Sequence, residues 1–435
     1  MLLDADKGLE ALSRLVRGSM SSRDTVRESL RLINASWLCV IAGLGLTMIG
    51  IYAIDVAQNL SGSSALAQEA WKQVVFATIG MMGGLAVALP HYRLLSILAW
   101  PAMVVMLGLL VFLLLPFVPT AIVAPRNGAR AWINLGVADF QPSELTKIAY
   151  VFVVARYLRF RTKHRRFLGL IVPGLLTVPP LVLITLQPDL GTASLFIPSL
   201  FGMLVAAGAK LRHLALIVAA AALTAPGAYP MLQPHQKVRI EGLVQQMQGD
   251  RSSAQDINFQ SFTAQTLIGS GQAQGVPDDM ARALVHYNRL PERHNDMIYS
   301  VVVARFGLVG GAIVLGLYLV WIAGALLVAA GCREPFGRLM TVGLTGFIAA
   351  QMTVNIGMNV GLLPVIGITL PFLSYGGSSM LTVWLMTGLI VNVALHRPRP
   401  PYRSSFEYAD DDDELSFSTR PYGRSIGFGG RALSR

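Results

Sequence analysis

The chain has 435 residues, of which 53% are hydrophobic and 14% charged, with a formal net charge of +11. Soluble globular proteins carry about 25% charged residues, so this composition excludes an ordinary soluble domain and predicts a polytopic membrane protein. A net positive charge can indicate nucleic-acid binding. Here, however, Lys and Arg lie between the apolar runs, where they indicate which loops face the cytoplasm. The two cysteines, Cys39 and Cys332, indicate neither a disulfide framework nor a metal cluster.

Residues 1–36 are predicted to form a cytoplasmic N-terminal segment. Charged residues alternate with Leu and Val in residues 11–33. The segment lacks the apolar core that a cleavable signal peptide needs. Two interpretations stay open: an amphipathic helix that lies on anionic lipid, or a mobile tail.

Ten apolar runs follow, and each is predicted to cross the membrane as an α-helix, because a crossing needs about 20 residues. The predicted spans are residues 37–56, 72–89, 93–118, 143–158, 168–186, 189–209, 212–230, 297–330, 338–362 and 371–396. The run at 297–330 exceeds one crossing, so we expect it to tilt or to continue past the bilayer. Residues 37–396 are therefore expected to form one all-α polytopic transmembrane domain.

The polar residues 397–435 are predicted to be a disordered cytoplasmic tail. They include an acidic run at 410–414 among scattered Gly, Ser and Arg, a composition that does not form a packed core.

Lys and Arg in the short loops assign the two sides of the membrane. The basic loops are residues 156–166, 210–212, 333–338 and 397–403. With ten spans they fall on one side together with the basic N-terminus, so both termini are predicted to be cytoplasmic. The outward segments are then residues 57–71, 119–142, 231–296 and 363–370. Of these, the loop at 231–296 is large enough to hold structure of its own.

Ionisable side chains cluster where the chain enters the fourth predicted span. Residues 141–144 can start a helix, and they place Glu144 and Lys147 three residues apart on one face. Arg130 and Trp132 lie just upstream. The pair is either an ion pair that anchors the helix or part of a functional site.

Asp189 lies near the outer end of the sixth predicted span. An acid beside apolar runs needs a partner, and Lys147 or Arg130 would serve. A purely structural pair is the alternative.

The segment 355–380 joins the last two predicted spans and carries helix breakers such as Pro364, Gly367 and Pro371. Irregular backbone at membrane depth must be buried in protein or line a polar cavity. Ser374, Tyr375 and Ser378 are predicted to line that cavity. Close helix packing through small residues would explain the Gly and Ser but not the prolines.

Four ionisable residues open the long run at 297–330: Glu292, Arg293, His294 and Asp296. A carboxylate at the edge of a low-dielectric region is a candidate general base, and nearby cations would hold an anionic ligand such as a phosphate. For Glu292, Arg293 and His294, a solvated interfacial cluster is the alternative. The sequence has no two-His metal spacing, P-loop or nucleophile elbow.

Six separated motifs carry a resemblance to a known family. They are GARAWINLG with FQPSELTKIA, QPDLGT, HQKVR, GSG, LPERHND and NIGMNVGLLPVIGITLPFLSYGGSSML. Their order and spacing resemble the SEDS family (shape, elongation, division and sporulation proteins) across residues 37–396. The resemblance is closest to the elongation member RodA, with the division member FtsW next.

The resemblance implies a peptidoglycan glycosyltransferase of the bacterial cytoplasmic (inner) membrane that polymerises lipid II on its outer side during cell-wall elongation. It implies an inverting transfer from a lipid-pyrophosphate-linked donor, with Asp296 as the essential carboxylate that acts as general base. It also implies a class B penicillin-binding protein as partner, beside lipid II, prenyl-pyrophosphate-linked glycan and membrane lipids, and no nucleic acid. The implied substrate-binding residues are Arg130, Glu144, Lys147, Asp189, Ser374, Tyr375 and Ser378, with Trp132, Glu292 and His294 in supporting positions.

The sequence departs from the family in four places. Asp139 stands where many members have a basic residue, and Asn288 where many have an acid. Ala304 and Arg305 replace paired acids, and residues 249–262 replace the usual segment of the large loop.

Two alternatives to a polymerase therefore stay open. A lipid II flippase needs ionisable residues at several depths on both sides, and a low-activity SEDS scaffold would only position a penicillin-binding protein. No cofactor is assigned; a divalent cation (Mg or Mn) is left open, because the sequence shows no ligand set for one.

Overall fold

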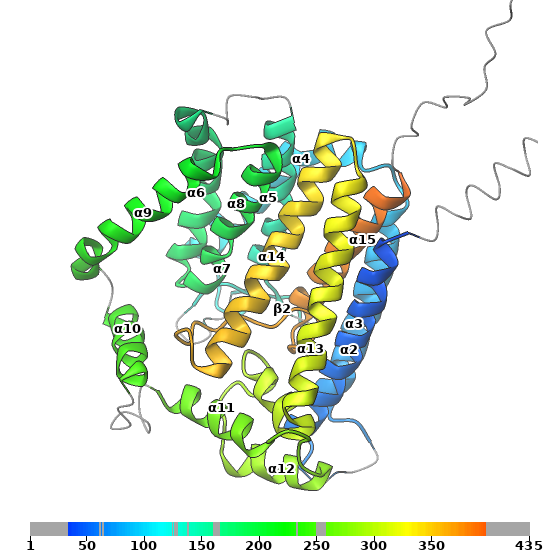
Figure 1. Ribbon diagram of the computed structural model, residues 1–435, viewed down its shortest axis with the longest axis vertical. Coiled ribbons are helices and arrows are strands. Elements are labelled where there is room, and N and C mark those ends of the chain that lie inside the picture. The colour runs from blue at the N-terminus through cyan, green and yellow to red at the C-terminus, as the bar shows by residue number, and fades with distance from the viewer. Residues whose placement is uncertain are drawn as a thin grey trace, which may run out of the picture. The chain divides into compact units, whose positions relative to one another are not determined.

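A computed structural model describes residues 34–60, 62, 65–123, 125, 129–136, 139–159, 166–231, 234–248 and 258–396. The predictions for residues 1–33, for the tail from 397 onwards and for the divergent segment 249–257 lie outside these residues. Within the described part, regular structure is helical apart from one short hairpin (Figure 1).

Along the chain, helices precede and follow this hairpin before the large loop begins. These elements are α2 (Ser36–Gln58), α3 (Gln68–Ala88), α4 (Arg93–Leu114), β1 (Ile133–Asn134), β2 (Asp139–Phe140), α5 (Pro142–Arg159), η2 (Phe167–Leu170), α6 (Ile171–Leu186), α7 (Leu190–Ser194), α8 (Phe196–Ala207) and α9 (Leu211–Ala228). The later elements are η3 (Tyr229–Met231), α10 (Pro234–Met247), α11 (Phe259–Ser270), α12 (Asp278–Tyr287), α13 (Ile298–Gly331), α14 (Pro335–Val360) and α15 (Gly377–Leu395).

Eight of the helical segments in the described residues are long and apolar enough to cross a membrane. They are α2, α3, α4, η2 with α6, α7 with α8, α13, α14 and α15. The all-α fold class is confirmed. The count of ten is not reproduced, because the predicted spans 143–158 and 212–230 correspond to α5 and α9, which are helices outside that set of eight.

The position of α5 explains why its sequence is less apolar than that of its neighbours. It packs against α4, α6, α8, α14 and α15, and most of its residues are buried. A helix that faces other helices need not be apolar all round as a lipid-facing one must. It can therefore carry Glu144 and Lys147 into the interior.

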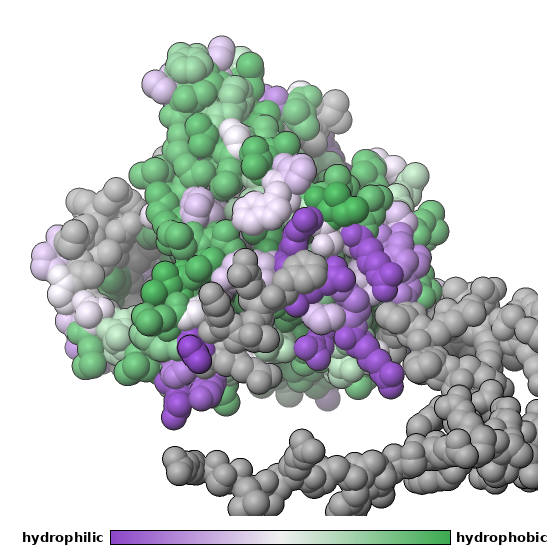
Figure 2. All heavy atoms as spheres, turned by 90° about the horizontal axis from the view of Figure 1, so that it is seen from above, coloured by the Kyte–Doolittle hydropathy of each residue, from purple (hydrophilic) through white to green (hydrophobic). Residues whose placement is uncertain are grey.

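Basic side chains gather at one end of the bundle. Figure 2 looks onto the end that is uppermost in Figure 1, where hydrophilic side chains collect beside a mainly hydrophobic surface. Arg159 pairs with Glu334 at 3.0 Å, and Arg156 donates to the carbonyl of Ser96. This clustering agrees with the one-sided Lys and Arg pattern of the sequence, on which the proposed cytoplasmic orientation rests.

Helix α13 has 34 residues, which is more than one membrane crossing needs, and it consists of two helical parts separated by a break near its start. Gly307 has φ +67° inside the helix, a conformation that favours glycine. The amides of Leu308 and Val309 donate instead to the carbonyls of Gln272 (2.9 Å) and Ala273 (3.2 Å) in the large loop. The loop therefore caps the break, and residues 298–306 form a separate half-helix that follows directly after Asp296.

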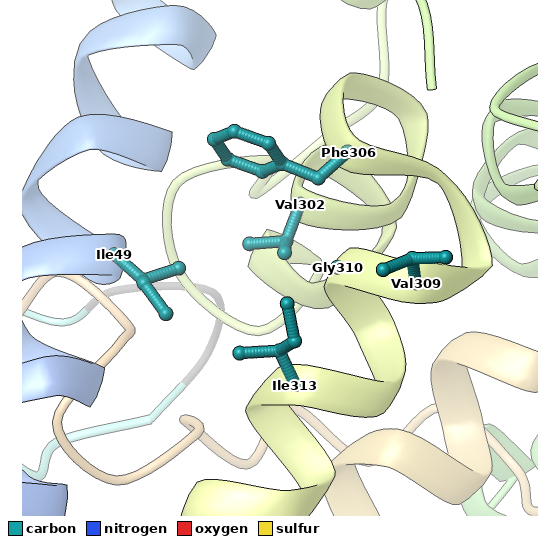
Figure 3. A pocket seen from close by; sticks show the side chains of 6 residues that line it. All are labelled: Ile49, Val302, Phe306, Val309, Gly310 and Ile313. Carbon is teal, nitrogen blue, oxygen red and sulfur yellow. The ribbon is translucent and has the colours of Figure 1, made fainter. Parts of the chain in front are cut away.

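An apolar pocket of about 220 Å³ lies beside this break, between α2 and α13 (Figure 3). Its lining residues are Ile49, Val302, Phe306, Val309, Gly310 and Ile313. None of the site residues predicted from the sequence lines it, so this pocket is not part of the predicted site.

Helices α3 and α15 approach each other through glycines. A Cβ added to Gly388 would lie 2.1 Å from the carbonyl oxygen of Gly84, and one added to Gly84 would lie 2.6 Å from the carbonyl oxygen of Trp384. Such spacing lets two backbones meet, as small residues do in membrane helix pairs. This contact holds α3 against the middle of the last helix, α15.

We expect Gly388→Ala to lower the free energy of unfolding by about 1–3 kcal/mol, because the added methyl group must push two backbones apart. Thermal unfolding of the detergent-solubilised protein measures the loss. Gly316→Ala in α13 is the matched control, since a Cβ there meets no atom of the described protein within 4 Å. An equal loss of stability in both variants would contradict the close contact.

Candidate functional site

Asp296 lies at the junction between the large loop and α13. It is 6% exposed, and its main-chain carbonyl accepts hydrogen bonds from the side-chain amides of Asn355 (2.8 Å) and Asn359 (2.9 Å). A Cβ added to Gly367 would lie 3.9 Å from Asp296 Oδ2. The carboxylate is thus beside the non-helical segment 361–376, which connects α14 to α15 (Figure 1).

Segment 361–376 is tied to the residues just before Asp296 by two sets of bonds. Ser374 Oγ donates to the carbonyl of Asn295 (2.5 Å) and accepts from the amide of Leu370 (2.7 Å). The amide of Tyr375 donates to the carbonyl of His294 (2.9 Å), and the two rings lie 5.7 Å apart. The structure therefore places Ser374, Tyr375 and His294 in the segments next to Asp296, and their predicted roles at the site stay predictions.

Gln73 of α3 is a site residue that the sequence analysis missed. It is fully buried; its Nε2 donates to the carbonyl of Ser374 (2.9 Å) and its Oε1 accepts from the amide of Gly376 (3.2 Å). Gln73 directly follows Lys72 at the start of the predicted span 72–89, so in the sequence it resembles an ordinary polar residue at the end of a span and gives no separate signal.

Lys147 and Glu144 form an interior ion pair. Lys147 Nζ lies 2.8 Å from Glu144 Oε1 and donates to Gln351 Oε1 at 3.3 Å. Lys147 is 1% and Glu144 4% exposed, and Glu144 Oε2 has no hydrogen-bond partner among the described residues. Gln351 in turn donates to the carbonyl of Thr369 (3.0 Å). The lysine is therefore linked through one side chain to the segment that borders Asp296.

Burial limits what Lys147 can contact in this conformation, because the residue is 1% exposed. Its predicted role in binding substrate stays a prediction. A buried cation can also act on a nearby site electrostatically, and such an influence is stronger in a low-dielectric interior than in water.

Asp189 has partners other than the predicted cations. Its Oδ1 accepts from the amide of Thr192 (2.9 Å) as the N-cap of α7, and its Oδ2 accepts from Gln141 Nε2 (3.2 Å). The expected pairing with Lys147 or Arg130 is thus replaced by capping and an amide contact, because a helix N-terminus offers an acid free donors.

Ser378 connects the hairpin to α15. Its Oγ accepts from the amide of Gln141 (2.9 Å) and donates to the carbonyl of Asp139 (3.0 Å). The start of α5, which leads to Glu144, is thereby held against the start of α15. Ser378 binds protein here, so its predicted contact with substrate stays untested.

Arg130 and Trp132 lie in the segment before the hairpin, apart from the contacts described above. Arg130 Nη2 donates to the carbonyl of Val118 (3.3 Å), and the recorded contacts of the described residues do not join it to Asp296 or Lys147. Both side chains are partly buried. Their predicted roles stay predictions.

The turn before Asp296 is shaped by Glu292. This exposed residue has φ +51°, its carbonyl accepts from the amide of Asn295 (2.9 Å), and its Oε2 accepts from Asn295 Nδ2 (2.5 Å). Glu292 therefore orders the backbone that leads to Asp296, which agrees with a supporting position.

Partial burial lowers the pKa of His294 below its usual value of 6.5, and Arg293 lowers it further, while Glu292 and Glu69 oppose the shift. The imidazole is therefore neutral near pH 7. A neutral ring beside Tyr375 can both donate and accept a hydrogen bond at the edge of the site.

The departure at Arg305 has a structural explanation. Arg305 Nε lies 3.2 Å from Asp278 Oδ1 and 3.1 Å from Tyr52 Oη, and Arg282 bridges Asp278 (2.7 Å) to Asp55 (2.8 Å). Burial raises the pKa of Asp278, but hydrogen bonds from Tyr52 and the two arginines outweigh it and lower the pKa overall. The arginine thus belongs to a network that holds α12 against α2 and α13.

Within the described ranges, no three His, Cys, Asp or Glu side chains are grouped so that they could hold a metal ion. The residues do not supply a ligand set for the divalent cation that the sequence left open. No step below depends on one.

Comparison with known proteins supplies the family. Residues 33–399 match the family model FtsW/RodA/SpoVE, described as "Cell cycle protein". The chain is 30% identical to a protein of Nitrosococcus halophilus named probable peptidoglycan glycosyltransferase FtsW, over 86% of this chain and 94% of that one. It is 27% identical to the peptidoglycan glycosyltransferase RodA of Treponema pallidum, over 82% and 96%.

A solved structure has the same fold. It comes from work titled "Structural coordination of polymerization and crosslinking by a peptidoglycan synthase complex". That chain aligns with a TM-score of 0.68 at 29% identity, covering 82% of this chain and 97% of its own. The helical arrangement of this chain is therefore similar to that of a chain from a peptidoglycan synthase complex.

Proposed function

Because the chain belongs to the FtsW/RodA/SpoVE family, we propose that it is a peptidoglycan glycosyltransferase that polymerises lipid II into glycan strands during cell-wall elongation. The SEDS resemblance of the motifs and the family match agree. Relatives named for division and for elongation have similar identities, so the elongation role rests on the motifs alone.

One observation carries the proposal for the site. Asp296, 6% exposed, lies beside segment 361–376, and the Lys147–Glu144 pair connects to the same segment through Gln351. A carboxylate at the edge of a buried polar cluster, with a cation behind it, suits a reaction that moves a proton and develops negative charge.

In the proposed reaction, the growing strand is the donor and is linked to its lipid by pyrophosphate. The acceptor hydroxyl of an incoming lipid II attacks the anomeric carbon, and Asp296 takes the hydroxyl proton. The bond between the anomeric carbon and the pyrophosphate oxygen breaks, with inversion, and the lipid pyrophosphate leaves as an anion. Arg130 is proposed to contact that anion, and Lys147 to stabilise it through the field.

We also propose the membrane setting and the partner. The protein is assigned to the bacterial cytoplasmic (inner) membrane, with Asp296 on the outer side, because the basic loops at 156–166 and 333–338 mark the other side. A class B penicillin-binding protein is the proposed partner, since one similar chain comes from a complex that couples polymerization to crosslinking.

We expect the purified protein, reconstituted in liposomes with labelled lipid II and its penicillin-binding protein, to produce long glycan that lysozyme degrades. A flippase would move lipid II across the bilayer without polymer, and a scaffold would give neither product. Transport without polymer, or polymer formed only by the partner, would overturn the proposed activity.

A further inference from the structure

Three amide side chains form a stripe along α14. Gln351, Asn355 and Asn359 follow one another at intervals of four residues, which places them on one face of the helix. They are 2%, 0% and 0% exposed. A buried amide is costly unless it is hydrogen-bonded, so the partners of this stripe show what it holds.

The two asparagines converge on one carbonyl. Asn355 Nδ2 donates to the main-chain oxygen of Asp296 (2.8 Å) and to that of Ile368 (2.7 Å). Asn359 Nδ2 donates to the same oxygen of Asp296 (2.9 Å), and Asn359 Oδ1 accepts from the amide of Ser300 (3.3 Å). Both carbonyls belong to residues outside helices, so neither takes part in a helical backbone hydrogen bond.

These bonds hold the two sides of the Asp296 carboxylate together. One side is the main chain of Asp296 itself, and the other is the turn at Gly367, next to Ile368. One helical turn earlier, Gln351 joins Thr369 to Lys147. The stripe therefore sets the placement of Asp296, of residues 367–369 and of the interior cation relative to one another.

We propose that Asn355 and Asn359 are positioning residues for glycosyl transfer, which fix the main chain of Asp296 against residues 367–369. The inference rests on the proposed function, because it requires Asp296 to act in the reaction. Both asparagines act through the backbone and touch no reacting atom. Misplacement of a reacting group by about 1 Å can cost about 100-fold in rate, so loss of either amide affects the chemical step more than binding.

The test compares Asn355→Leu and Asn359→Leu with wild type, using lipid II and the partner protein. We expect kcat to fall by about 10- to 100-fold, while KM for lipid II stays within about threefold, since the groups that bind the pyrophosphate are not moved. Asn392→Leu is the matched control. Asn392 is fully buried on α15 and donates to two carbonyls, those of Val87 (2.6 Å) and Pro90 (2.5 Å), neither of which contacts the site.

Thermal unfolding of the three variants is measured in parallel. The inference is supported if all three variants lose a similar amount of stability but kcat falls only in Asn355→Leu and Asn359→Leu. A kcat equal to that of Asn392→Leu would overturn it. If the leucine variants do not fold, the three alanine variants give the same comparison.

An Asp296→Asn variant in the same assay separates this inference from the proposed function. If that variant is inactive while Asn355→Leu and Asn359→Leu match the control, the positioning role alone fails. If the Asp296→Asn variant is fully active, Asp296 is not the general base, and the positioning role that rests on it is wrong as well.

Discussion

Replacement of Asp296 by asparagine is expected to abolish polymerisation while the protein stays folded. General base catalysis contributes about 10²- to 10⁴-fold, and asparagine cannot take the acceptor proton. The substitution conserves shape at a 6% exposed position. The bonds from Asn355 and Asn359 go to the main-chain carbonyl, so they remain in the variant.

Polymer length and initial rate with labelled lipid II measure this prediction, and binding of lipid II to the variant checks that the substrate is still held. Asp279→Asn is the matched control, because Asp279 is exposed on α12 in the same large loop and has no part in the contacts around Asp296 described for the site. We expect it to retain activity within about threefold, since a surface substitution rarely costs more than about 0.5 kcal/mol. Full activity of Asp296→Asn would refute the base assignment.

Much of the fold follows from apolar run lengths. The predicted span 72–89 became α3 (Gln68–Ala88), and 338–362 became α14 (Pro335–Val360). The predicted span 143–158 also became a helix, α5 (Pro142–Arg159), although it lies outside the eight long apolar segments. Other helices surround α5, so it can carry charged residues that a lipid-facing helix would not.

The convergence at Asp296 was predictable only in part. The outward placement of segments 231–296 and 363–370 put Asp296 and the turn before the last span on the same side of the membrane. In the structure the residues that follow this turn meet those before Asp296, through the Tyr375 amide on the His294 carbonyl and Ser374 Oγ on the Asn295 carbonyl. The amide of Gln73 meets Ser374 across 301 positions of the chain, and no local pattern reveals such a contact. The spacing of Gln351, Asn355 and Asn359 is visible in the sequence and places them on one face of a helix. The sequence does not show which main-chain carbonyls this face contacts, and the role of the three amides depends on those contacts.

Arg305 departs from the family pattern, but the structure gives its side chain an ion-pair partner. Judged by the motif alone, a cation in place of an acid put substrate contacts and loop regulation in doubt. In the structure its guanidinium pairs with Asp278, which also pairs with Arg282. The replacement lies in a network that docks α12 and is separate from the contacts of Asp296, so it does not by itself favour loss of activity.

The second large effect is expected at the Lys147–Glu144 pair. Lys147→Ala leaves the Glu144 carboxylate, which is 4% exposed, without its cation. Removing one member of a buried pair typically costs about 3–5 kcal/mol. We therefore expect a large fall in thermal stability together with loss of polymerisation, and that result alone cannot tell an anchoring ion pair from a functional one.

The double variant Lys147→Met with Glu144→Leu separates the two roles. Replacing both members of a buried pair with apolar groups of similar volume is often neutral or stabilising, so most of the stability should return. If Lys147 stabilises the leaving pyrophosphate through the field, kcat stays at least about 10-fold below wild type, because each 1.4 kcal/mol of lost transition-state stabilisation is a factor of 10. Recovery of both stability and kcat would instead show that the pair only anchors α5, and the positive charge for the reaction would then have to come from Arg130 or from another outward cation.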